Sequence, residues 1–127
     1  MLVANVDDFN KYNETYGYVA GDEVLQRLEA LMKSEFQNDL VVRLGGQQFI
    51  ILTKDTESVA FQRANQLMNQ VYELNIEHVT NLEHHRLTLT VGVVGGSFDS
   101  MLKLDQGIQR AQEKVMLSKK KKNYINE

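Results

Sequence analysis

Residues 40–52 read LVVRLGGQQFIIL, and this stretch decides the fold. Two apolar runs, Leu40–Val42 and Phe49–Leu52, flank the glycine pair Gly45-Gly46. A glycine pair between apolar runs is typical of a β-hairpin, because a tight turn needs positive φ angles that glycine adopts at no steric cost. The stretch therefore predicts two antiparallel strands joined by a turn at Gly45-Gly46.

The sequence before the hairpin predicts one strand and two helices. Residues 2–6 form a near-continuous apolar run, which is typical of a strand covered on both faces. Asp7 and Asp8 follow it as expected caps of a short helix. Gly17 ends that helix, and Asp22 stands at an expected N-cap of the next, which carries an apolar stripe over residues 24–32.

The sequence after the hairpin completes an α+β pattern. Apolar residues at helical spacing predict helices over residues 59–74 and 104–115. Alternating residues over 87–93 predict a strand with one face on the core, and a short closing strand is expected at residues 124–125. The resulting order, βααββαβα, favours a ferredoxin-like fold in which helices flank a central, mainly antiparallel sheet.

Composition narrows the function classes. The 127 residues suit one domain, and the net charge of −3 gives no reason to expect a nucleic-acid binder. The absence of cysteine excludes disulfides, thiol catalysis and thiolate metal sites. No apolar run approaches the ~20 residues that span a bilayer. The absence of cysteine fits a reducing cytoplasm, and we expect a cytoplasmic location, including that of a cytoplasmic part of a membrane-bound sensor. Because a strand follows Met1 at once, we expect residues 1–127 to be a single domain excised from a longer multidomain protein.

Four blocks of the sequence, in order and with matching spacing, together resemble the GGDEF family of diguanylate cyclases over essentially the whole chain. The first block matches the family pattern D-x-D-x-F-K-x-x-N-D-x-x-G-H-x-x-G-D-x-x-L, and the second matches D-x-V-x-R-Y-G-G-D/E-E-F. The blocks are residues 5–25, 39–49, 87–93 and 111–119. The resemblance implies a nucleotide-cyclase-like palm that makes cyclic di-GMP from two GTP molecules in bacterial signalling, with divalent metals neutralising the phosphate charge.

The signature departs from the family at its acidic positions. Gly45-Gly46-Gln47-Gln48-Phe49 replaces the GGDEF or GGEEF motif, so Gln47 and Gln48 stand where the family has carboxylates. The first-strand metal Asp of the family aligns with Asn5. Because a neutral amide neither offsets the charge of Mg²⁺ nor acts as a general base, no catalytic set is intact and no metal is expected at Asn5 and Gln47.

The phosphate and feedback positions of the family have also changed. Asn10 stands where the family has a lysine that approaches the phosphates. In the family's inhibitory R-x-x-D motif, Asp39 keeps the Asp but Phe36 replaces the Arg, so the bidentate grip of a guanidinium is lost from that position. The resemblance therefore implies a degenerate inhibitory site.

Three residues match family positions that bind nucleotide. Asn13 and Asp22 align with the residues that contact guanine, and Lys119 aligns with a lysine that contacts phosphate. Each has a simpler interpretation, because Asp22 suits an N-cap, Asn13 a polar helix flank, and Lys119 a solvated helix end. His84-His85 is interpreted as an exposed loop edge, since adjacent side chains on a strand do not converge on one metal.

The leading hypothesis is an inactive GGDEF domain that acts as a regulatory or GTP-sensing module in cyclic di-GMP signalling. It requires no cofactor, and Mg²⁺ enters only if nucleotide binding persists. Expected partners are GTP or another guanine nucleotide, an attached or separate GGDEF, phosphodiesterase or sensor domain, and a second copy in a homodimer. The alternatives are a low-activity diguanylate cyclase or nucleotide hydrolase, and a structural dimerisation domain without ligand.

Overall fold

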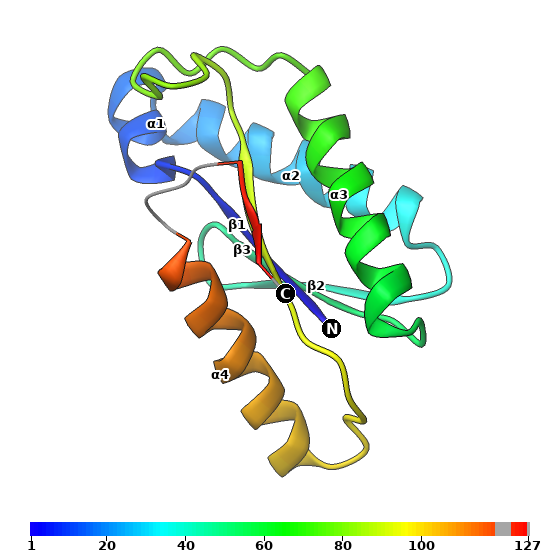
Figure 1. The fold of residues 1–127 in the computed structure, drawn as a ribbon. Coiled ribbons are helices and arrows are strands. Elements are labelled where there is room, and N and C mark those ends of the chain that lie inside the picture. The colour runs from blue at the N-terminus through cyan, green and yellow to red at the C-terminus, as the bar shows by residue number, and fades with distance from the viewer. Residues whose placement is uncertain (119–122, 127) are drawn as a thin grey trace.

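A computed structural model describes residues 1–118 and 123–126, which form a five-stranded sheet with helices on both faces (Figure 1). The sheet order is β2-β3-β1-β4-β5, and every pairing is antiparallel except that of β4 with β5. This confirms the α+β fold with a mainly antiparallel sheet. The elements are β1 Leu2–Val6, α1 Phe9–Tyr16, α2 Tyr18–Glu35, β2 Leu40–Leu44, β3 Gln48–Leu52, α3 Glu57–Glu73, β4 Leu89–Val93, α4 Met101–Leu117 and β5 Ile125–Asn126.

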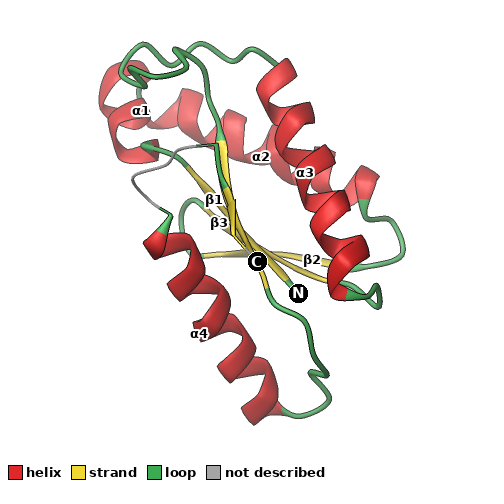
Figure 2. Cartoon of the chain, viewed as in Figure 1, coloured by secondary structure: helices red, strands yellow, loops and turns green. Residues whose placement is uncertain are grey.

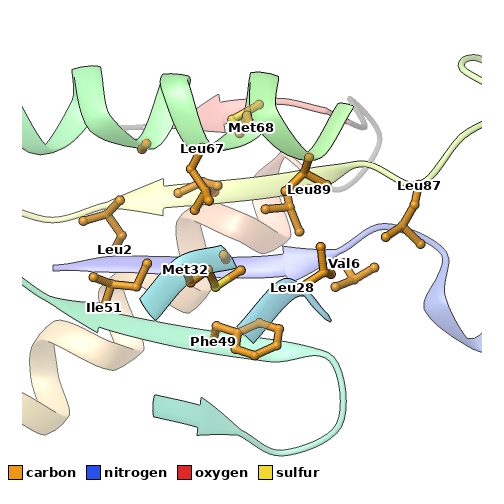
Figure 3. Packing of buried hydrophobic residues seen from close by; sticks show 14 of the residues in the cluster. Leu2, Val6, Leu28, Met32, Phe49, Ile51, Leu67, Met68, Leu87 and Leu89 are labelled. Atoms are coloured by element: carbon orange, nitrogen blue, oxygen red, sulfur yellow. The ribbon is translucent and has the colours of Figure 1, made fainter. Parts of the chain in front are cut away.

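The sheet separates two apolar clusters, because α2 and α3 lie on one side of it and α4 lies on the other (Figure 2). On one face, α2 and α3 pack on alternate residues of the strands, and Figure 3 shows Leu28, Leu67 and Leu89 among the buried side chains of this cluster. On the other face, α4 covers a smaller cluster that contains Val3 and Ala111. Because β1 lies in the middle of the sheet and has helices over both faces, its apolar run is buried on both sides, as the sequence predicts.

Strand β4 differs from its sequence-based prediction of one buried face. All five of its residues are buried, because α4 covers the face that carries Thr90 and Gly92. A Cβ on Gly92 would lie 2.6 Å from the carbonyl oxygen of Ala111, so glycine is what lets α4 approach the strand. Alternation of threonine and glycine with apolar residues therefore marks close packing here, and not exposure to water.

Two helix starts also differ from the predictions. Helix α2 begins at Tyr18 with Gly17 at its N-cap, so the prediction that Asp22 caps this helix is wrong. Gly17 has a φ of 91°, which suits a residue without a side chain between two helices. At α1, Asp8 occupies the N-cap position, but its side chain makes no capping hydrogen bond. Asp7 lies in the interior and does not cap the helix.

The hairpin is present, with a loop of three residues between Leu44 and Gln48 in place of a two-residue turn. Gly45 has a φ of 65°, so the glycine requirement applies there. The closing strand β5 is also present, one residue later than predicted, and it pairs in parallel with β4. Among the helices of the described residues, none has the length and apolarity needed to cross a bilayer.

Candidate functional site

A cavity of about 230 Å³ opens where β1 ends. The chain from residue 5 to residue 11 forms one side of it, passing from β1 into the first turn of α1. Gln47 of the hairpin loop, Thr90 of β4 and Val115 of α4 complete the lining. The cavity thus collects polar side chains from three places in the sequence, and it holds several of the residues singled out above.

The two amides that replace metal-binding carboxylates both line this cavity. Asn5 stands on the α4 face of the sheet, opposite Gln48 on β3 and Thr90 on β4. Gln47 is fastened beside it, because its carbonyl oxygen accepts a 3.1 Å hydrogen bond from the N–H of Val6. The oxygen Oδ1 of Asn5 is sealed from solvent and has no hydrogen-bond partner within the described residues. The structure therefore places Asn5 and Gln47 in the lining of one cavity.

The rest of the degenerate signature lies outside the cavity. The side chain of Gln48 turns toward α4, where its Oε1 accepts a 2.9 Å hydrogen bond from Nε2 of Gln112. Phe49 is fully buried in the larger core, and Gly45 and Gly46 form the hairpin loop. Asn10 does line the cavity, at the first turn of α1. Of the two glutamines, only Gln47 is placed to meet a ligand in this cavity.

Asp7 is a buried carboxylate that sequence reasoning had placed in a cap. Its Oδ1 accepts a 2.7 Å hydrogen bond from the hydroxyl of Thr90, and its Oδ2 accepts 2.7 Å from the hydroxyl of Thr88 and 2.9 Å from the N–H of Asn123. Burial raises the pKa of Asp7, while the three hydrogen bonds oppose that rise. Both oxygens are thus already engaged inside the protein.

The remaining donor set does not fit a magnesium site. Mg²⁺ favours a near-octahedral set of hard oxygens that includes carboxylates. Asn5 and Gln47 are neutral, and Asp7 is committed to its threonine partners, which leaves Asp8 as the other carboxylate in the lining. Within residues 1–118 and 123–126, no group of three or more acidic, histidine or cysteine side chains is arranged to hold a metal ion.

Asn13 and Asp22, matched to guanine recognition, lie outside the cavity lining on α1 and α2. The Oδ1 of Asn13 is sealed from solvent without a hydrogen-bond partner in the described chain, and a Cβ on Gly21 would collide with it. The carboxylate of Asp22 is exposed, accepts a 3.2 Å hydrogen bond from Gln26 and lies 3.9 Å from Nη1 of Arg43. The two residues are neighbours through Gly21. Lys119 lies outside the described residues.

The position of the family's inhibitory motif contains a guanidinium that sequence reasoning missed. Phe36 is buried, and the guanidinium of Arg63 on α3 lies 4.2 Å from the centroid of its ring. Arg63 donates hydrogen bonds to Asp39 (2.9 Å), to Asp55 (2.5 Å) and to the carbonyl oxygen of Glu35 (2.9 Å). The hydrogen bond from Arg63 holds the pKa of Asp55 below its usual value. No local pattern marks Arg63, because Asp39 is 24 residues away.

A buried histidine was also missed. His78 is fully buried, with Nε2 3.1 Å from the carbonyl oxygen of Asp8 and its ring edge against Tyr12. It ties the loop before β4 to the start of α1. Of the histidines considered above, His84 packs edge-on against Tyr72 and His85 is exposed, in keeping with a loop edge.

The fold defines a class, that of α+β palm domains in which helices flank a mainly antiparallel sheet. The family model described as "Diguanylate cyclase, GGDEF domain" matches residues 1–124, and the chain therefore belongs to the GGDEF family. It is related to the diguanylate cyclases of cyclic di-GMP signalling.

Among curated relatives, diguanylate cyclase A of Treponema denticola is 33% identical over 101 residues, which cover 78% of this chain and 27% of that protein. Diguanylate cyclase DosC of Escherichia coli K12 is 29% identical over 123 residues, covering 95% of this chain and 26% of that protein. The chain thus spans about a quarter of the length of these two bacterial relatives.

Solved structures show the same fold. The GGDEF domain of DgcB from Caulobacter crescentus, in complex with c-di-GMP, superposes with a TM-score of 0.82 at 19% identity over 98% of this chain and 74% of that chain. The active GGEEF domain of a diguanylate cyclase from Vibrio cholerae superposes with a TM-score of 0.77 at 23% identity, over 98% of this chain and 79% of that chain.

Proposed function

We propose that this GGDEF domain has lost cyclase activity and acts as a regulatory module that senses a guanine nucleotide, GTP, in cyclic di-GMP signalling. One observation carries the proposal: the cavity beyond β1 presents the amides of Asn5 and Gln47 where the family pattern has carboxylates. Phosphoryl transfer depends on metal ions that neutralise charge on the phosphates, and these amides do not supply the anionic ligands for such ions.

Loss of activity is supported by more than two substitutions. Gln48 is a neutral amide whose Oε1 accepts a hydrogen bond from Gln112, so it is not a general base. Both carboxylate oxygens of Asp7 accept hydrogen bonds from the protein, so Asp7 does not supply a general base either. A general base has to reach the proton that it removes. Asp8 alone does not replace the missing ligand set.

Retention of a nucleotide site is supported by Asn13. A buried polar oxygen without a partner costs free energy, of the order of 1–3 kcal/mol. The Oδ1 of Asn13 is such an atom, and it packs against Gly21, the residue that precedes the exposed Asp22. Both are hydrogen-bond acceptors, which suits the N–H groups on the edge of a guanine ring. The bound state would be passed to an attached or separate GGDEF, phosphodiesterase or sensor domain.

The activity test is incubation of the purified domain with GTP and Mg²⁺ or Mn²⁺, followed by chromatography for cyclic di-GMP. We expect no product, while the active GGEEF domain from Vibrio cholerae, treated in parallel, gives product. Formation of cyclic di-GMP at a comparable rate would refute the loss of activity and favour the low-activity cyclase.

The binding test is isothermal titration with GTP. We expect heat of binding in the wild-type domain, a loss of at least tenfold in affinity in Asp22→Ala, and no change in Asp105→Ala, which removes an exposed helical carboxylate elsewhere. Absence of heat in the wild type would leave the structural dimerisation domain as the supported function.

A further inference from the structure

An amide that replaces a carboxylate changes what a cavity attracts. Asparagine has the shape of aspartate, but it carries no charge and it offers two N–H donors. A carboxylate repels a phosphate unless a cation lies between them, whereas an amide N–H donates directly to a phosphate oxygen. Asn5 and Gln47 therefore make phosphate binding without a metal chemically feasible at the position where the family pattern requires one.

The surroundings of Asn5 leave its side chain for a ligand. Its two cross-strand neighbours are already engaged, Gln48 with Gln112 and Thr90 with Asp7. Its own Oδ1 has no partner among the described residues, so rotation of the amide breaks no hydrogen bond to that oxygen. A phosphate oxygen accepts hydrogen bonds, so the groups that would meet it are the N–H groups of this amide, which rotation turns toward the cavity.

The opposite wall adds a second favourable element. Helix α1 begins at Phe9, and its first residues, Phe9 to Lys11, line the same cavity. The first backbone N–H groups of a helix have no intrahelical acceptor and attract anions. The ammonium of Lys11 adds positive charge at this wall, which counters the carboxylate of Asp8 in the lining.

The size of the cavity points to part of a nucleotide. Pockets for whole small molecules commonly occupy roughly 300–1,000 Å³. The cavity here measures about 230 Å³, and Asn13 and Asp22 lie outside it. This division suits a phosphate group inside the cavity and a base outside it.

We infer that the cavity at the end of β1 binds the phosphate groups of a nucleotide directly, through the amides of Asn5 and Gln47 and the start of α1, without a divalent cation. The inference rests on the proposed function, which requires that a guanine nucleotide bind at all. It goes further, because it reverses the metal dependence that the family pattern implies.

The first test is titration of the whole domain with GTP in EDTA and again in Mg²⁺. Affinity in EDTA is expected to equal or exceed that in Mg²⁺, and guanosine, which lacks phosphate, is expected to bind at least tenfold more weakly than GTP. A tenfold loss of GTP affinity in EDTA overturns the inference while leaving the proposed sensor intact. No heat in either buffer overturns both.

The second test restores negative charge. Gln47→Glu lies in the hairpin loop, outside the core, and is expected to lower GTP affinity at least tenfold in EDTA and to recover part of it in Mg²⁺. Asn5→Asp is expected to act in the same direction. The matched control is Gln106→Glu, which makes the same charge change on the exposed surface of α4 and leaves affinity unchanged. A Gln47→Glu domain that binds GTP in EDTA as tightly as the wild type contradicts the inference.

Discussion

The guanidinium of Arg63 lies 4.2 Å from the centroid of the Phe36 ring and donates a 2.9 Å hydrogen bond to Asp39. Phe36 and Asp39 are the two ends of the degenerate inhibitory motif, and Arg63 comes from a different helix. A guanidinium thus lies at the motif although its own arginine position holds Phe36. The N–H groups of Arg63 already donate hydrogen bonds to Asp39, to Asp55 and to the carbonyl oxygen of Glu35. This cluster joins α3 to the ends of α2 and β3.

Arg63→Ala is expected to lower the free energy of unfolding by about 1–3 kcal/mol, because it leaves the largely buried carboxylate of Asp39 without its partner. Urea denaturation followed by circular dichroism measures this. The control is Lys33→Ala, which removes an exposed pair with Glu29 and is expected to cost less than about 0.5 kcal/mol. If the two variants lost equal free energy of unfolding, the hydrogen bonds of Arg63 would stabilise the fold no more than an exposed ion pair does.

Cyclic di-GMP is expected not to bind at the Phe36–Asp39 position, because a ligand there would have to displace hydrogen bonds that Arg63 already makes. Isothermal titration of the wild-type domain with cyclic di-GMP is the measurement. Binding heat that disappears in Asp39→Asn would contradict this expectation and would mean that Arg63 exchanges its internal partners for the ligand.

Gly92→Ala is expected to destabilise the domain by about 1–3 kcal/mol, since its Cβ would lie 2.6 Å from the backbone oxygen of Ala111 and would push α4 off the sheet. Gly46→Ala serves as the control, because a Cβ there meets nothing within 4 Å and we expect a change within about 0.5 kcal/mol. Thermal unfolding of both variants tests the pair. A Gly92→Ala variant as stable as Gly46→Ala would argue against close packing of α4.

The stability of the wild type is expected to depend on pH through Asp7. Burial raises the folded-state pKa of Asp7 above the ordinary value of 3.8, so the folded protein keeps this proton to higher pH than the unfolded chain does. The contribution of Asp7 is therefore fully present below the unfolded pKa and is lost as the pH rises through the folded pKa.

Asp7→Asn removes this titration. Urea unfolding between pH 3.5 and 7 is expected to show the free energy of the wild type falling relative to that of the variant as the pH rises. A difference between the two proteins that is flat or of opposite slope over this range would show that the hydrogen bonds from Thr88 and Thr90 outweigh burial.

The elements of the fold could be predicted because their signals are local. Apolar runs, helical stripes and the hairpin glycines occupy short windows, and each maps onto an observed element. The start of α2 could not be placed, because Gly17 fits a conformation of positive φ while Asp22 offered the usual chemistry of a cap. Strand β4 was misread on one face, because Thr88 and Thr90 resemble exposed residues until their hydroxyls are seen to bond to Asp7.

The candidate site divides in the same way. The family pattern marks Asn5 and Gln47 as positions of one metal site, and both residues line one cavity. Arg63 and His78 could not be found, because each acts on residues far along the chain, Asp39 and Asp8, which only the folded arrangement brings near. These contacts could not be predicted because the partners are far apart in the sequence, although each contact is an ordinary hydrogen bond.

The central place of β1 has a consequence for synthesis. β1 is made before both of its partners, β3 and β4, and the second of these ends at Val93. At a translation rate of roughly 5–20 residues per second, the edge of β1 that pairs with β4 therefore waits for about 5–20 s after residues 2–6 are made. The hydrogen bond from the N–H of Asn123 to Oδ2 of Asp7 forms later still, and it closes a loop over almost the whole chain. In a nascent domain halted before β4, one edge of β1 is exposed and unpaired. When such a chain leaves the ribosome, chaperone binding competes with aggregation at this edge.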